Sequence, residues 1–130
     1  MILEETTDNK NKRLAGYSQI LYLLNITLLP IISFLLLIVL YQKHKANDSP
    51  LVIQHFRQSF LANIVAGILL IFVSGLILIF GSLESAYTWM WFILYFLSIH
   101  SVLILFGVLA YIKASAGQLY TYPVFGKLWE

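Results

Sequence analysis

The chain has 130 residues, of which 60% are hydrophobic and 11% are charged, and its formal net charge is +2. Soluble domains carry roughly 45–50% apolar and 25% charged residues, so this composition excludes a chain with a water-facing surface all around. We therefore predict an all-α integral membrane protein whose first partner is the lipid bilayer. The small positive charge gives no reason to expect a nucleic-acid partner, and the length leaves no room for a separate catalytic domain.

The first element is an apolar segment preceded by a polar stretch. Residues 1–13 predict a polar N-terminal tail at the membrane interface. Residues 14–41 are too long for the apolar core of a signal peptide, so we expect them to be retained. A continuous helix of this length would extend about 42 Å, enough to cross the membrane with a kink at Pro30. The alternative is a hairpin that turns back near Pro30, which would give four spans in total.

The second span follows a hydrophilic connector, residues 42–59. Within the connector, Ser49 and Pro50 form a favourable N-cap and first-turn pair, and the apolar spacing after them predicts a short interfacial helix. Residues 60–80 contain no charge over about 21 residues and predict a membrane span. Glu84 is the only charged residue in the loop that follows.

The third predicted span covers residues 89–112, which carry no full charge. Trp89 and Trp91 begin it and Tyr111 closes it, as the aromatic belts at two membrane interfaces would require. We thus predict one helical membrane domain over residues 14–124, followed by a short C-terminal tail, residues 125–130.

The positions of Lys and Arg give the expected orientation. With three crossings, five basic residues of the connector and C-terminal region face three in the N-terminal tail. In the hairpin alternative all eight lie on one side, which fits the positive-inside rule better, but each arm has only about 12 to 15 residues against roughly 17 to 25 for a full span. We favour three crossings. Both alternatives predict a cytoplasmic connector and a cytoplasmic C-terminus.

A group of polar residues marks the entrance to the second span: His55, Arg57, Gln58 and Asn63. The simpler interpretation is a membrane anchor, in which the Arg57 side chain reaches up to the headgroups. The functional interpretation is a docking edge, either for a partner or for the chain's own segment from Gly117 to Pro123.

His100 lies near the middle of the third span, where an ionisable side chain is a functional candidate. Haem ligation would need a second histidine at that depth, and His44 and His55 belong to the connector, so we predict no cofactor. A neutral His100 hydrogen-bonded to a neighbouring helix, for instance at Ser74 or Thr27, fits better.

Small residues recur at spacings that let membrane helices approach closely. They are Ala62 with Ala66, Ala110 with Ala114, and the glycines Gly67, Gly75 and Gly107. We find no nucleotide-binding loop, metalloprotease or hydrolase motif and no paired carboxylates within a span, so we predict neither an enzyme nor a metal site.

Two stretches resemble blocks of a known family. "NDSPLVIQHFRQSFLANI" and "AYIKASAGQLYTYP" resemble small bacterial membrane proteins related to Tic-twenty, a component of the chloroplast protein-import translocon. The residues that carry the resemblance are His55, Phe56, Gln58 and Asn63 in the first block and Ala114, Ala116, Gly117, Tyr122 and Pro123 in the second. The resemblance covers roughly residues 14 to 124 and implies a small helical protein of the bacterial inner membrane with cytoplasmic motif loops.

Two functions follow from these observations. The first is a non-catalytic accessory or assembly subunit that packs against a larger membrane complex. The alternative is a homo-oligomeric transport or channel-forming component, with a polar route past His55, Asn63, Ser74 and His100. One chain is too small to enclose a pore, so this alternative predicts several copies.

Overall fold

The computed structural model describes residues 2–46 and 49–129, and within them every regular element is a helix. Residue 1 of the predicted N-terminal tail, residues 47 and 48 of the connector and residue 130 of the C-terminal tail lie outside the described residues. The elements are α1 (Ile2–Thr27), α2 (Ile32–His44), α3 (Pro50–Phe80), α4 (Ala86–Tyr95), the π-helix η1 (Phe96–His100), α5 (Ser101–Ser115) and the 3₁₀-helix η2 (Gly126–Trp129). The all-α membrane bundle predicted from the sequence is confirmed.

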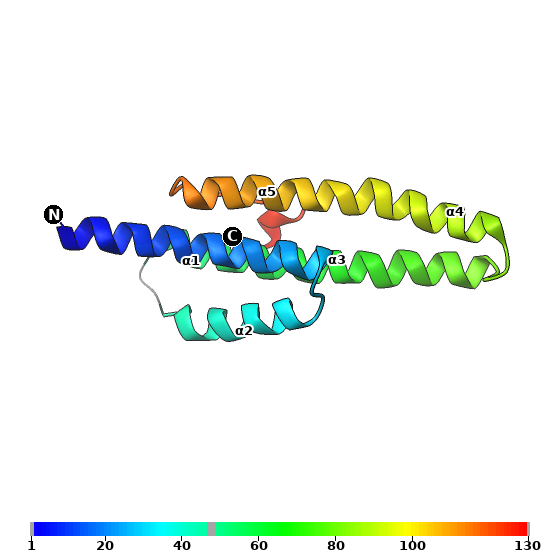
Figure 1. The fold of residues 1–130 in the computed structure, drawn as a ribbon, viewed down its shortest axis with the longest axis horizontal. Coiled ribbons are helices and arrows are strands. Elements are labelled where there is room, and N and C mark those ends of the chain that lie inside the picture. Colours follow the sequence, from blue (N-terminus) through cyan, green and yellow to red (C-terminus); the bar gives the residue numbers. More distant parts are fainter. Residues whose placement is uncertain (1, 47–48, 130) are drawn as a thin grey trace.

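The first apolar segment is a hairpin, so the favoured long kinked helix is wrong. Pro30 lacks a backbone N–H, and α1 ends three residues before it, at Thr27. The N–H of Ile31, whose φ is 72°, donates to Oδ1 of Asn25 at 2.9 Å. This side-chain bond closes the turn, and α2 then runs back antiparallel to α1 (Figure 1).

Two further boundaries differ from the prediction. The polar residues 2–13 are helical and form the first turns of α1. The expected interfacial helix is not separate, because α3 begins at Pro50, with Ser49 as its N-cap residue, and continues unbroken to Phe80. Its 31 residues extend about 46 Å, which covers the hydrocarbon core and both headgroup zones.

Within the part of the chain that the structure describes, two segments have the length and composition to cross a membrane: Pro50–Phe80 and Ala86–Ser115. The second contains α4, η1 and α5 in one continuous run. The loop between the two segments is closed by Trp89, whose indole N–H donates to the carbonyl oxygen of Leu83 at 2.8 Å. With 13 residues, α2 is about 20 Å long and too short to span the bilayer alone.

The hairpin gathers the basic residues toward one end of the bundle. Figure 1 shows the start of α1, the end of α2, the start of α3 and the end of α5 at this end, which we call the charged end. The opposite end carries the Gly81–Ser85 loop with Glu84. Pro30 and Ile31 of the turn between α1 and α2 lie across one groove from Gly67 and Ile71 of α3. We call residues 67–80 of α3, together with α4 and η1, the two-helix half; in Figure 1 this part extends past the turn.

Small residues allow the close packing near the charged end, as predicted. Ala62, Ala66, Ala110 and Ala114 are all buried. At Gly107 an added Cβ would lie only 2.6 Å from Cδ2 of Leu23, so this glycine permits the contact between α5 and α1. Gly67 and Gly75 differ from this pattern, since an added Cβ would meet nothing within 4 Å at either position.

Candidate functional site: the clip that holds the C-terminal tail

Residues 118–126 are held against α3 by two glutamine side chains. We call these residues the tail; it begins earlier in the chain than the predicted C-terminal tail of residues 125–130. Gln58 accepts a hydrogen bond from the backbone N–H of Tyr122 at 3.0 Å and donates one to the carbonyl oxygen of Gly126 at 2.8 Å. Gln54 accepts from the N–H of Tyr120 at 3.2 Å and donates to the carbonyl oxygen of the same residue. The side-chain amides thus pair with the tail as a neighbouring backbone strand would.

The spacing of these two glutamines matches the spacing of the tail residues. Positions four apart on a helix are displaced by about 6 Å along its axis. Positions two apart in an extended chain are displaced by about 6.6 Å, and their N–H groups point the same way. Gln54 and Gln58 therefore meet Tyr120 and Tyr122 in register.

His55 and Gln19 hold the same tail from a second side. One ring nitrogen of His55, Nε2, lies 2.8 Å from the carbonyl oxygen of Gln118, and the other, Nδ1, lies 3.0 Å from the amide nitrogen of Gln19. The carbonyl can only accept and the amide nitrogen can only donate, so the contacts fix a neutral imidazole with its proton on Nε2. The Tyr122 hydroxyl donates to Oε1 of Gln19 at 2.6 Å, which closes the network.

We call Gln19, Gln54, His55 and Gln58 the tail clip. His55, Gln19 and Gln58 are at most 1% exposed, as is Tyr122. Burial is the main cause that raises the pKa of Tyr122 well above its ordinary value, with added repulsion from Tyr22 and Tyr120. The Tyr122 side chain is therefore a neutral hydrogen-bond donor at physiological pH.

The turn that leads into the tail depends on Gly117. Its φ of +74° is the left-handed conformation that glycine adopts without strain. The N–H of Gln118 donates to the carbonyl oxygen of Lys113, and that of Gly117 to Ala114, which is the Schellman ending of a helix. An added Cβ at Gly117 would lie 2.8 Å from Cε of Lys12, so the turn also packs against α1.

The structure brings together only part of the predicted site. His55, Gln58 and Tyr122 meet at the tail clip. Gly117 lies directly before the segment that the clip holds, and Pro123 lies within it. Arg57 points away and is exposed.

Gln19 and Gln54 complete the tail clip, yet neither was among the predicted site residues. For Gln19 a signal existed, because an uncharged amide inside an apolar segment must find a partner. That partner could not be named before the hairpin and the tail were placed.

Asn63 belongs to a second polar site, at the tip of the α1–α2 hairpin. Its Oδ1 accepts from the amide of Asn25 at 2.7 Å, and its own amide donates to the carbonyl oxygen of Ser59 at 2.9 Å. Since Asn25 also binds the N–H of Ile31, the two asparagines tie the turn to the middle of α3.

His100 bonds to a neighbouring helix, but its partner is neither Ser74 nor Thr27. Nε2 lies 2.6 Å from the carbonyl oxygen of Ile26, in the last turn of α1, where carbonyl groups lack a partner within the helix. His100 thus caps α1 from the adjacent helix. Its Nδ1 is buried and has no hydrogen-bond partner among the described residues, and the π-helical turn η1 ends at this residue.

A groove of about 530 Å³ separates the hairpin tip from the two-helix half. Its polar lining comes from Asn25, Thr27, Asn63 and His100, and the rest is apolar. The groove lies next to the middle of α3, at the level where the α1–α2 hairpin ends.

The family model that describes the magnetosome magnetite crystal formation proteins, MamF/MmsF, matches residues 10–129. The chain belongs to this family. No curated protein and no solved structure matches the chain. The MamF/MmsF match corrects the resemblance to Tic-twenty relatives. The two blocks quoted for that resemblance contact each other in this chain, through His55 with Gln118 and Gln58 with Tyr122.

Membership of MamF/MmsF agrees with a small membrane protein and does not indicate an enzyme. Among the described residues, no three His, Asp or Glu side chains lie together as ligands for a metal ion. The polar groups that the structure does gather, in the tail clip and at the hairpin tip, bind backbone and side-chain groups of the chain itself.

Proposed function

We propose that this protein is a non-catalytic accessory subunit of the membrane in which magnetite crystals form, and that it packs against a larger membrane complex there. The family match over residues 10–129 carries the proposal. The chemistry of the structure supports it, because the buried polar groups near the charged end serve to close the fold.

The two-helix half is the surface that we propose for the larger complex. Gly67 and Gly75 lie eight residues apart on α3, which separates them by about 80° around the helix axis, so both face the same side of α3 without being aligned. Both leave open space where a side chain would stand. In lipid, where apolar surface alone drives no association, such smooth faces let a second helix approach closely.

We further propose that the charged end faces the cytoplasm. All eight Lys and Arg residues belong to segments that meet at this end or, for Lys127, to the tail region that folds back from it. The opposite loop carries only Glu84. This distribution follows the positive-inside rule, which sets orientation by the Lys and Arg of short loops.

Complementation tests the proposed process. The chain would be expressed in a magnetosome-forming bacterium that lacks its own members of the family, and crystal sizes would be measured by electron microscopy. We expect the size distribution to shift toward that of the parent strain. If the protein is present in the magnetosome membrane and the crystal sizes do not change, the proposed role in magnetite formation is wrong.

Co-purification tests the accessory role separately. The tagged protein, extracted from that membrane in a mild detergent, should carry a larger partner in fixed ratio. Substituting Gly67→Leu and Gly75→Leu should release the partner, whereas Ala86→Leu adds similar bulk at the exposed start of α4 and should not. Recovery as a homo-oligomer without another protein would contradict the accessory role and favour the transport alternative.

A further inference from the structure

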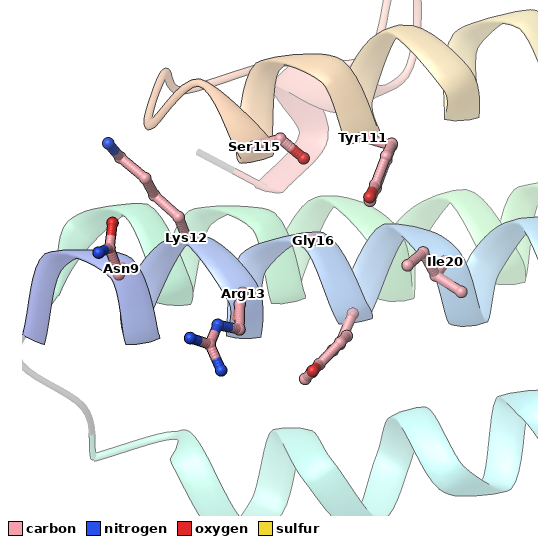
Figure 2. Close-up of a pocket in the computed structure, with 8 residues that line it drawn as sticks. Asn9, Lys12, Arg13, Gly16, Ile20, Tyr111 and Ser115 are labelled. Carbon is pink, nitrogen blue, oxygen red and sulfur yellow. The ribbon is translucent and has the colours of Figure 1, made fainter. Parts of the chain in front are cut away.

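A shallow depression with several polar lining residues lies between α1 and the end of α5, apart from the tail clip and from the groove at His100. Its volume is about 260 Å³. It is lined by Asn9, Lys12, Arg13, Gly16, Tyr17, Ile20, Tyr111 and Ser115. Figure 2 shows Lys12, Ser115 and Tyr111 on the α5 side of Gly16 and Arg13 on the other side. Gly16 has no side chain, and an added Cβ would lie 3.4 Å from the Tyr111 ring, so α1 and α5 approach closely at the floor of the depression.

The depression lies where both helices change from apolar to polar. On α1 the apolar segment starts directly after Arg13, and on α5 it ends directly before Lys113. Tyr17 and Tyr111, both partly exposed, lie just on the apolar side of this boundary. Tyrosine favours the headgroup zone of a bilayer, so we place the depression at the level of lipid headgroups.

The charge of the depression is positive and only partly compensated. Nζ of Lys12 pairs with a carboxylate oxygen of Asp8 at 3.0 Å, one helical turn away. Arg13 makes no ion pair with any described residue. The amide of Asn9 and the hydroxyl of Ser115 add neutral hydrogen-bond donors around the same opening.

We propose that this depression binds the phosphate of an anionic glycerophospholipid. Arginine, lysine, amide and hydroxyl groups are the donors that recognise phosphate oxygens, and the planar guanidinium can bind two of them at once. Ile20 lies on the apolar side of the opening, so the acyl chains can continue along α1 into the bilayer. The proposal does not depend on the proposed function.

The test compares lipids bound to the purified full-length protein in detergent, by native mass spectrometry. Phosphatidylglycerol, phosphatidylcholine and inorganic phosphate are added in separate titrations. We expect the protein to retain phosphatidylglycerol in preference to phosphatidylcholine. Arg13→Ala should weaken phosphatidylglycerol binding about fivefold, the effect of losing one partly exposed charged contact.

Two further variants separate a built site from general charge attraction. Lys43→Ala removes one positive charge at the same end of the bundle, from α2, and should leave the affinity unchanged. Asp8→Asn removes the carboxylate that competes for Lys12 and should strengthen binding. All three changed residues are exposed, so loss of folding is not expected.

Opposite shifts for Arg13→Ala and Asp8→Asn, with no shift for Lys43→Ala, would support the site. Equal weakening by Arg13→Ala and Lys43→Ala would overturn it, because the preference would then reflect total charge. Binding of inorganic phosphate as tight as that of phosphatidylglycerol would also overturn it and assign a soluble phosphate ligand.

Discussion

In the described part of the chain, buried polar groups are paired within the chain near the charged end, but several toward the two-helix half are not. Near the charged end, the buried side chains of Gln19, His55, Gln58 and Tyr122 all have hydrogen-bond partners within the chain. Toward the two-helix half, Ser74 Oγ, Tyr95 OH and His100 Nδ1 are buried without a partner among the described residues.

Large apolar side chains are exposed in both regions, for instance Val39 on α2 and Leu105 on α5, so it is the unpaired polar atoms that distinguish the two-helix half. Phe72, Ile79 and Phe80 on α3 and Leu97 just after α4 are each more than 60% exposed. Lipid can cover such side chains, but it cannot donate hydrogen bonds to the polar atoms beneath them. The difference indicates that the charged end is complete within one chain, whereas the two-helix half is suited to receive a further helix.

The largest expected effect is at the tail clip. Gln58→Leu keeps the apolar stem but leaves the N–H of Tyr122 and the carbonyl of Gly126 unpaired, so we expect tail binding to weaken by about 2–4 kcal/mol. Tail release is measured as the rate of trypsin cleavage after Lys127, by mass spectrometry, in detergent. The neighbouring Arg57→Leu is the control and should change the rate little, because Arg57 is exposed.

If Gln58→Leu and Arg57→Leu accelerate cleavage equally, the tail is not held by the contacts described. Thermal unfolding of the same variants separates release of the tail from loss of the bundle. We expect the bundle to melt at nearly the parent temperature, since α1, α3 and α5 pack together without the tail.

The second-largest expected effect is a loss of stability at Gly107, with Gly75 on the two-helix half as the matched comparison. Gly107→Ala places a methyl group 2.6 Å from Leu23 and 2.7 Å from the Tyr22 ring. Leu23 can rotate, but the Tyr22 hydroxyl is tied to the carbonyl oxygen of Leu103 at 3.0 Å, so the ring resists. We expect a loss of about 1–3 kcal/mol, measured by thermal unfolding in detergent.

The matched change Gly75→Ala should cost nothing and can stabilise α3 by up to about 1 kcal/mol, because alanine is the better helix former. A loss of stability at Gly75 as large as at Gly107 would contradict the open surface that we describe on the two-helix half.

The sequence predicted the membrane class, the long spans and the start of α3, because each depends on local composition and capping. At Pro30 the sequence led us to the wrong alternative, the kinked helix, where the structure has a hairpin. In that prediction the short length of the two hairpin arms counted for more than the distribution of Lys and Arg. The arms, however, need to reach only part-way across the bilayer. The deciding contact, from Asn25 to Ile31, is a single side-chain bond.

The candidate site was predictable to the same limited extent. His55 and Gln58 were conspicuous as polar residues at the start of a span, and their own tail was one of the two partners considered. Gln19 lies 36 residues before His55 and could be paired with it only after folding.

At the boundary between the two regions, we expect a moderate effect from His100→Leu. The change removes the bond to the carbonyl of Ile26 and leaves the end of α1 uncapped, at a cost of about 1–2 kcal/mol in thermal unfolding. Ser98→Ala is the control, since the Ser98 hydroxyl bonds only within its own helical run, to Leu94 and Tyr95. Equal stability of His100→Leu and the parent protein would show that the imidazole does not cap α1.

The smallest effect concerns backbone strain in the tail. Val124 has a φ of 72°, which a β-branched residue adopts only at a cost, and its side chain is 98% exposed. Val124→Asn keeps a side chain that tolerates this conformation and loses no packing, so the tail should bind more tightly by about 1 kcal/mol and cleavage after Lys127 should slow. Leu119→Asn also replaces an exposed apolar tail residue, but at negative φ, and should give no such gain. An equal slowing in both variants would mean that the added amide, and not the relieved backbone, holds the tail, because only Val124 carries the strain.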